Sequence, residues 1–215
     1  MNLSEPLSAI VSGLDAPVLR VLSRTTQPLS GSRIAALAEK SVAGVRKCLG
    51  RLVEQGTVIV HQAGPSLMYV ANREHLAWAG IQAAVDVADA LLRELEGRIV
   101  QELEIYVGRE IGDRCTLAVF GSVARGTSTP QSDLDLLVLC PDEIDTEQVD
   151  RFVDSVQNQV KRWTGNTCNI LTVNQRRFAQ LKAGHDPLWE SWRDEARTFH
   201  GPELRLILSD AIAAG

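Results

Sequence analysis

The chain has 215 residues, of which 45% are hydrophobic and 23% are charged, and its formal net charge is −5. This composition is typical of a globular protein with a real core, and the length accommodates two domains of ordinary size. The sequence excludes a helical membrane-spanning protein, because the longest apolar run, near residues 136–140, is far shorter than the ~20 residues that span a bilayer. Residues 1–15 lack the basic head and apolar core of a signal peptide. We therefore expect a cytoplasmic protein with no membrane partner.

The cysteines and histidines give no sign of a disulfide framework or a zinc site. The four cysteines are widely separated without a C-x-x-C pair, and the four histidines form no cluster with the spacing of metal ligands. Buried, reduced thiols are the expectation for a cytoplasmic protein.

Charge is distributed unevenly along the chain. Residues 1–80 carry eight Lys and Arg against five Asp and Glu, whereas the other 135 residues carry fourteen against twenty-two. Because nucleic-acid affinity depends largely on neutralising phosphates, only the first part is suited to face DNA.

Short helical patterns and turn signals alternate in the first 72 residues. A helix is expected over residues 17–22, a second over Gly31–Glu39 with Ser30 as its N-cap, and a third over Val42–Gln55 with Ser41 as its N-cap. In the third helix the apolar positions face inward and leave basic side chains outside. Two strands are then expected over residues 57–61 and 67–70, joined by residues 62–66.

This order of helix, helix, turn, basic helix and β-hairpin resembles the bacterial winged helix-turn-helix over about residues 17–72. In that family the second helix of the pair enters the major groove of double-stranded DNA and the hairpin touches the adjacent groove or phosphates. The alternative is a winged helix used only for protein contacts or dimerisation, and the basic exposed face in an acidic chain favours DNA. The resemblance implies DNA contacts from Ala43, Gly44, Arg46, Lys47, Arg51, His61, Gln62 and Ser66.

Residues 73–112 form a long run without proline in which apolar residues recur near a period of 3.6. We expect a helical linker with one buried face, bent or interrupted at Gly80 and Gly97. The apolar positions are Leu76, Ile81, Val85, Val87, Leu91, Leu95, Ile99 and Leu103.

The clearest pattern is a strand over Thr116–Phe120, a turn that begins with Gly121 and Ser122, and a second strand that begins with Asp133 and Asp135. A glycine at the turn lets a polyanion approach the backbone, and the serine offers a hydroxyl and amides to phosphate oxygens. The two aspartates are two residues apart on a strand, so both point to one face with Cα atoms about 6–7 Å apart. Two carboxylates that close repel each other unless a cation lies between them, and Mg²⁺ would also bridge to a triphosphate.

The combination G-S-x-A-R-G and, after a short loop, S-D-x-D-L resembles the minimal nucleotidyltransferases of the DNA polymerase β superfamily over residues 115–173. The resemblance implies an α/β (α+β) domain with a small mixed sheet. It implies that Gly121 and Ser122 hold the phosphates of a nucleoside triphosphate and that Asp133 and Asp135 bind Mg²⁺ or Mn²⁺. Arg125 either contacts phosphate or pairs with a local acid.

One residue departs from that family. Active members place a third carboxylate on the next strand, which here is expected over Thr167–Val173 after a helix over Glu147–Trp163. Asn169 occupies the expected position of the acid, and an amide neither takes a proton nor carries the charge. Asp186 lies in a loop beyond that strand and is a poor substitute.

Three functions follow from these patterns. The first is a DNA-binding transcriptional regulator, with a winged helix-turn-helix over residues 1–72, a helical linker over 73–112 and a nucleotidyltransferase fold over 113–215, that binds a triphosphate and Mg²⁺ with weak or absent transfer. The second is an active enzyme that transfers a nucleoside monophosphate to a protein or nucleic-acid hydroxyl. The third is an antitoxin-like module that acts on a separate protein partner. A homodimer is compatible with each, and Trp189 and Trp192 are expected to pack in a core rather than to stack on a nucleobase.

Overall fold

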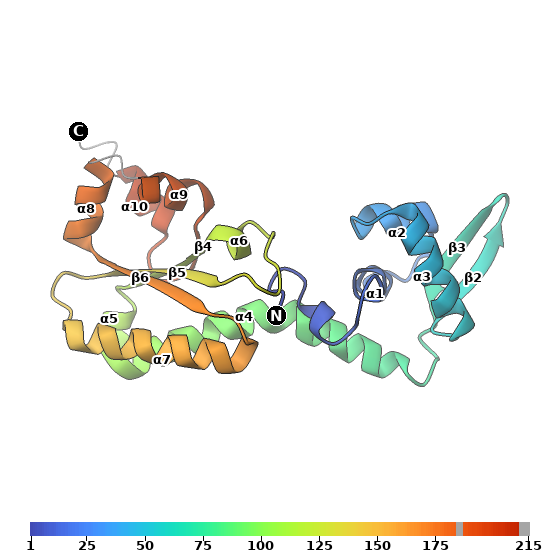
Figure 1. Cartoon of the computed structure of the whole chain (residues 1–215), viewed down its shortest axis with the longest axis horizontal. Coiled ribbons are helices and arrows are strands. Elements are labelled where there is room, and N and C mark those ends of the chain that lie inside the picture. Colours follow the sequence, from blue (N-terminus) through green and yellow to red (C-terminus); the bar gives the residue numbers. More distant parts are fainter. Residues whose placement is uncertain (184–186, 211–215) are drawn as a thin grey trace. The chain divides into compact units, whose positions relative to one another are not determined.

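The computed structural model describes residues 1–183 and 187–210 (Figure 1). The chain forms two compact units, one of Glu5–Leu91 and one of Met1–Ser4 with Leu92–Gly215. The helical run expected as a linker is shared between the two units. Among the described residues, no helix combines the length and the apolar character that a bilayer crossing requires.

The Glu5–Leu91 unit contains short helices and a small antiparallel sheet. The sheet order is β1-β3-β2, and Ala63 pairs with Ser66, so only two residues separate the strands of the hairpin. The expected five-residue connection is therefore wrong, because Gly64 adopts φ +59 and allows a tight turn. The elements are η1 (Pro6–Ala9), α1 (Asp15–Ser23), β1 (Leu29–Ser30), α2 (Gly31–Leu37), α3 (Val42–Glu54), β2 (Val58–Ala63) and β3 (Ser66–Ala71).

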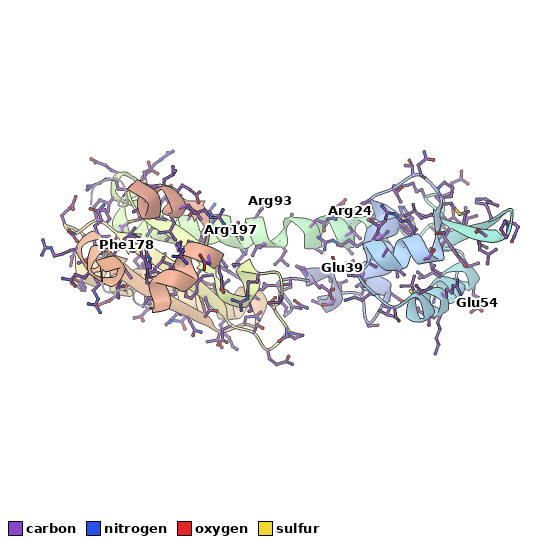
Figure 2. The ribbon with its side chains drawn as sticks, turned by 90° about the horizontal axis from the view of Figure 1, so that it is seen from above. Arg24, Glu39, Glu54, Arg93, Phe178 and Arg197 are labelled. Carbon is purple, nitrogen blue, oxygen red and sulfur yellow. The ribbon has the colours of Figure 1, made fainter. Side chains whose placement is uncertain are left out.

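Local signals set the helices of this unit. The Ser30 hydroxyl accepts a hydrogen bond from the Arg33 amide, and the Ser41 hydroxyl accepts one from the Gly44 amide, so both expected N-caps are confirmed. Arg24, which directly follows α1 and is labelled in Figure 2, shares the Asp89 carboxylate with Arg20 of α1. The core joins the three helices to the sheet through Val18, Leu22, Ile34, Val45, Leu49 and Val58.

Helix α4 (Trp78–Val107) is continuous through Gly80 and Gly97, so the expected interruption is wrong. The helix ends only at Gly108, which adopts φ +78 and leads into α5 (Arg109–Gly112). Leu95 and Ile99 are buried as expected, whereas Leu76, which precedes the helix, and Val87 are exposed, so the expectation for these two positions is wrong.

The unit of Leu92–Gly215 contains a mixed four-stranded sheet of order β6-β5-β4-β7, which confirms the mixed sheet expected for this part. Strand β5 is antiparallel to β4 and parallel to β6, and α7 makes the crossover between the two parallel strands. The elements after α5 are β4 (Thr116–Phe120), α6 (Gly121–Ala124), β5 (Leu134–Cys140), α7 (Thr146–Thr164), β6 (Cys168–Asn174), α8 (Gln175–Ala183), α9 (Pro187–Glu195), β7 (Arg197–His200) and α10 (Leu204–Asp210).

Helices cover both faces of this sheet. Figure 1 shows α7 on the opposite face from α8, α9 and α10. Trp192 is fully buried and lies in the same apolar cluster as Trp189 and Leu137 of β5, so the expected core packing is confirmed. Helices α9 and α10 are separated by β7, which pairs with β4. Asp186 lies outside the described residues. All four cysteines are free and buried, as expected.

Candidate functional site

The turn after β4 brings its backbone against the start of β5. Phe120 pairs with Asp135, and Gly121 follows at once with φ +69. A Cβ atom on Gly121 would lie 2.5 Å from Oδ2 of Asp135, which is closer than real Cβ atoms approach any heavy atom. Both the backbone angle and the close approach therefore require glycine here.

Two carboxylates and one amide converge beside this turn. Asp135 and Asn169 are register partners on the parallel strands β5 and β6. Nδ2 of Asn169 donates to Oδ1 of Asp135 over 3.1 Å and to Oδ2 of Asp133 over 3.3 Å. The carboxylates can only accept, so the NH₂ group of the amide must face them. The structure thus brings together the three residues that the sequence placed in one site.

In the described residues, no basic side chain pairs with either of the two carboxylates. Within residues 1–183 and 187–210, the ion pairs of Lys and Arg include neither Asp133 nor Asp135. Burial, and then the charges of Asp135 and Asp133, raise the pKa of the Cys168 thiol to about 12. Cys168, at the start of β6, is therefore a neutral neighbour of the site at physiological pH.

The donor set suits a hard divalent cation. Asp133 and Asp135 offer carboxylate oxygens, and Asn169 offers a carbonyl oxygen once its amide turns over. Mg²⁺ and Mn²⁺ prefer oxygen ligands, and Mg²⁺ is commonly held by one or two carboxylates together with substrate phosphates and water. In the described part of the chain no group of three or more His, Cys, Asp and Glu side chains is suited to hold a metal ion. The carboxylate count is two, as the sequence indicated.

Other residues of the turn form contacts within the protein at positions expected to bind phosphate. Ser122 is half-buried, and its carbonyl accepts the Thr127 amide over 2.9 Å, which closes the turn. Arg125 forms an ion pair with Glu195 of α9. Of the two alternatives for Arg125, the structure contains the pairing with a local acid.

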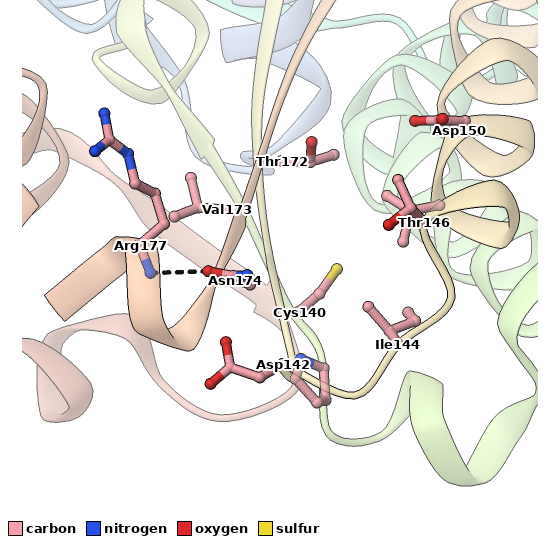
Figure 3. A pocket seen from close by; sticks show the side chains of 11 residues that line it. Cys140, Asp142, Ile144, Thr146, Asp150, Thr172, Val173, Asn174 and Arg177 are labelled. Atoms are coloured by element: carbon pink, nitrogen blue, oxygen red, sulfur yellow. Dashed lines mark hydrogen bonds between the residues drawn. The ribbon is translucent and has the colours of Figure 1, made fainter. Parts of the chain in front are cut away.

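A hollow of about 310 Å³ lies at the other ends of β5 and β6 (Figure 3). Cys140, Asn174 and Arg177 are among the residues that line it, and the Asn174 side chain accepts the backbone amide of Arg177. None of the site residues expected from the sequence lines this hollow.

The residues expected to contact DNA differ in their surroundings. Ala43, Arg46 and Lys47 of α3 are exposed. The Arg51 guanidinium instead binds the Asp15 carboxylate of α1, and a Cβ on Gly44 would lie 2.7 Å from Leu14. Arg51 is thus partly neutralised, and Gly44 serves the close packing of α3. The hairpin residues His61, Gln62 and Ser66 are exposed.

Sequence reasoning missed two neighbours of the site, Glu195 and Cys168. Glu195 lies 70 residues from its partner Arg125, and no local pattern joins them. The position of Cys168 could have been predicted from the sequence, because Cys168 directly precedes Asn169 on a strand and its side chain must point to the opposite, buried face.

Residues 101–179 match the family model of the nucleotidyltransferase domain. The match includes Gly121, Asp133, Asp135 and Asn169, so the whole site lies inside it. Comparison with curated proteins found no match. A nucleotidyltransferase domain is therefore present in the chain, and it accounts for less than half of the 215 residues.

Proposed function

We propose that this protein is a DNA-binding regulator whose nucleotidyltransferase domain binds a nucleoside triphosphate with Mg²⁺ or Mn²⁺ and transfers the nucleoside monophosphate from it slowly or not at all. One observation carries the proposal: Asn169 is the register partner of Asp135, and its amide donates to both carboxylates. The position from which a third acid would act holds a group that cannot accept a proton.

The residues of the site divide the work of binding. Gly121 lets the triphosphate approach the backbone, and Ser122 offers its hydroxyl to a phosphate oxygen. Asp133 and Asp135 would hold the divalent cation. When bound, the cation would neutralise their negative charges and attract the phosphates of the nucleotide. Asn169 orients the two carboxylates but does not activate an acceptor hydroxyl. General-base help is typically worth about 10²–10⁴-fold, so its loss makes transfer slow.

DNA binding is proposed for the Glu5–Leu91 unit. The support is the element order α1, β1, α2, α3, β2, β3, in which two capped helices precede a tight antiparallel hairpin as in a winged helix-turn-helix. Arg46 and Lys47 are adjacent and exposed on α3, in the part of the chain with a positive charge balance. Such cations neutralise phosphates, and double-stranded DNA is the partner that fits them.

Calorimetric titration with each of the four ribonucleoside triphosphates tests the nucleotide part, with and without Mg²⁺. We expect saturable binding of at least one triphosphate that depends on Mg²⁺ and is lost in the Asp133→Asn, Asp135→Asn double variant. A wild-type protein that binds none of the four would refute the proposal for this domain.

The active enzyme stays the second candidate, because the turn at Gly121 and the two carboxylates are intact. Incubation with an α-³²P triphosphate and candidate acceptors separates the two. Robust labelling by the wild-type protein that disappears in Asp135→Asn would establish the enzyme.

A further inference from the structure

Residues Met1–Ser4, called the strap below, lie against the loop Thr127–Ser132, which leads directly into Asp133. Both segments belong to the same compact unit, and Figure 1 shows the N-terminus beside this loop. The strap lies outside residues 101–179, which match the family model, and outside the sequence motifs of the site.

One end of the contact is a reciprocal pair of serines. The Ser4 amide donates to the Ser128 hydroxyl over 2.9 Å, and the Ser128 amide donates to the Ser4 hydroxyl over 3.0 Å. The two hydroxyls are 2.7 Å apart, and Ser128 also donates to the Asn2 side chain over 3.1 Å. The middle of the loop is therefore bonded to the strap through backbone and side chain alike.

The other end of the contact is Asn166, between α7 and β6. Its Oδ1 accepts a hydrogen bond from the Met1 amino nitrogen over 2.8 Å, and its Nδ2 donates a hydrogen bond to the Met1 carbonyl over 2.9 Å. The same Nδ2 donates to the Ser132 carbonyl over 2.8 Å, which is the peptide group that joins Ser132 to Asp133. One side chain thus bonds both the strap and the last peptide before the first metal-binding candidate.

These polar groups are buried, so their hydrogen bonds are costly to lose. Ser128 is 6% exposed and Asn166 is 4% exposed, and Leu3 of the strap is also buried, with 3% of its surface exposed. Breaking one partner leaves a buried donor or acceptor unpaired, which costs more than the bond itself contributes. Asn166 precedes Asn169 by only three residues. Thr167, which follows Asn166, accepts a hydrogen bond at its carbonyl from the Leu134 amide over 2.9 Å. Both strands that carry the site are therefore fixed at this point.

We propose that Ser128 and Asn166 are positioning residues, which the strap holds in place so that Asp133 stays beside Asp135 in the geometry that binds a divalent cation. The inference rests on the proposed metal binding. Residues bonded to metal ligands typically change metal affinity by about 10–100-fold when they are removed. Asn166 acts one peptide group away from Asp133, so we expect about tenfold, the lower end of that range.

The test uses the full chain and Mn²⁺ alone, with the dissociation constant measured by electron paramagnetic resonance. Asn166→Ala and Ser128→Ala should each weaken Mn²⁺ binding about tenfold. Asn158→Ala is the matched control, because Asn158 is an exposed asparagine of α7 that bonds only a local carbonyl in the described contacts. Ser4→Ala should weaken binding in the same direction, because it removes the acceptor of the Ser128 amide. The double variant Ser4→Ala, Ser128→Ala should bind Mn²⁺ no more tightly than Ser128→Ala, because it loses both reciprocal bonds of the serine pair.

A purely structural role would lower the melting temperature and leave the Mn²⁺ dissociation constant unchanged in folded protein, and that result overturns the proposal. Asp135→Asn shows whether the measured ion occupies this site. If the wild type binds no Mn²⁺, the metal proposal fails, and amide hydrogen exchange over residues 127–135 then decides the positioning role. Faster exchange in Asn166→Ala than in Asn158→Ala supports it, and equal exchange overturns it.

Discussion

Asn169 donates a hydrogen bond from Nδ2 to Oδ1 of Asp135 over 3.1 Å, and the two residues are register partners on adjacent parallel strands. In the function proposed above, the amide occupies the place from which a third acid would share a metal ion with Asp135. The amide bonds the carboxylate without adding charge, so under that proposal the site would bind a cation without supplying a proton acceptor at residue 169.

Asn169→Asp should restore the missing acid. We expect Mn²⁺ to bind more tightly than in the wild type, because a third carboxylate joins the donor set, and we expect labelling from an α-³²P triphosphate to become detectable. The gain should approach the ~10²–10⁴-fold that general-base catalysis supplies when a suitable acceptor is present. Labelling and Mn²⁺ affinity are measured on the same preparations.

Asn169→Ala controls for loss of the amide. It removes both hydrogen bonds without adding charge, so it should show neither the tighter Mn²⁺ binding nor the labelling. Equal behaviour of the two variants would mean that the carboxylate at residue 169 has no effect on the site.

Gly121→Ala should damage the site more than an alanine at another glycine with the same backbone. Gly121 and Gly126 have φ of +69 and +71, so each substitution costs about 1–2 kcal/mol of left-handed strain. Only at Gly121 would the new Cβ also lie 2.5 Å from Asp135, whereas nothing lies within 4 Å at Gly126. Urea unfolding should show a larger loss for Gly121→Ala, and Mn²⁺ affinity should fall in that variant alone.

If both variants lost the same free energy of unfolding and kept Mn²⁺ affinity, the close approach of Gly121 to Asp135 would have no energetic weight. Gly126→Ala is the appropriate control because its residue lies outside the site.

Features with local sequence signals could be predicted, and features made by distant pairing could not. Ser30 and Ser41 were identifiable as N-caps because a cap needs only the helix that follows it. Asn169 was identifiable through the family resemblance, which expects an acid on the strand after the crossover helix, and β6 does pair with β5 so that Asn169 is the register partner of Asp135. Strands β1 and β7 have only two and four residues, and pairing with β3 and β4 defines them rather than their own composition.

Side-chain partners show the same limit. Arg51 was expected to face DNA because helical periodicity places it outside, but periodicity does not reveal the Asp15 carboxylate 36 residues earlier. The resemblance implied a DNA contact from Gly44, but a resemblance does not reveal that Leu14 lies 2.7 Å from where a Cβ atom on this residue would be. The strap contacts, at separations above 120 residues, had no sequence signal.

Stability above pH 9 should depend on Cys48. Burial, and then the hydrogen bond to Asp15 and the charge of that residue, raise the pKa of the Cys48 thiol from 9.0 to about 12. Between these values the unfolded chain loses the proton while the folded chain keeps it. The free energy of unfolding should therefore be fully supported below pH 9 and fall as pH rises toward 12, by up to about 1.4 kcal/mol per pH unit from this group.

Urea unfolding of the wild type and of Cys48→Ala, at about pH 8 and about pH 10.5, checks this expectation. The wild type should lose more stability between the two conditions than the variant does. Parallel losses would show that the thiol titrates alike in the folded and unfolded chains.

DNA binding should depend on Arg46 and Lys47. Both side chains are exposed on α3, and neither forms an ion pair in the described part of the chain. Replacing both with alanine should abolish binding to a duplex from the promoter region of the protein's own gene while the fold stays intact. Each lost phosphate contact should also reduce the slope of log affinity against log salt by about one. Fluorescence anisotropy across a salt series measures both quantities.

The adjacent cations Lys161 and Arg162 of α7 provide the matched control, because they too are an exposed Lys and Arg pair. Their double alanine variant changes the net charge by the same amount but lies in the nucleotidyltransferase domain. It should keep the affinity and the salt slope of the wild type. If the two double variants lost affinity equally, binding would follow the total charge of the protein, and the DNA-reading assignment of α3 would fail.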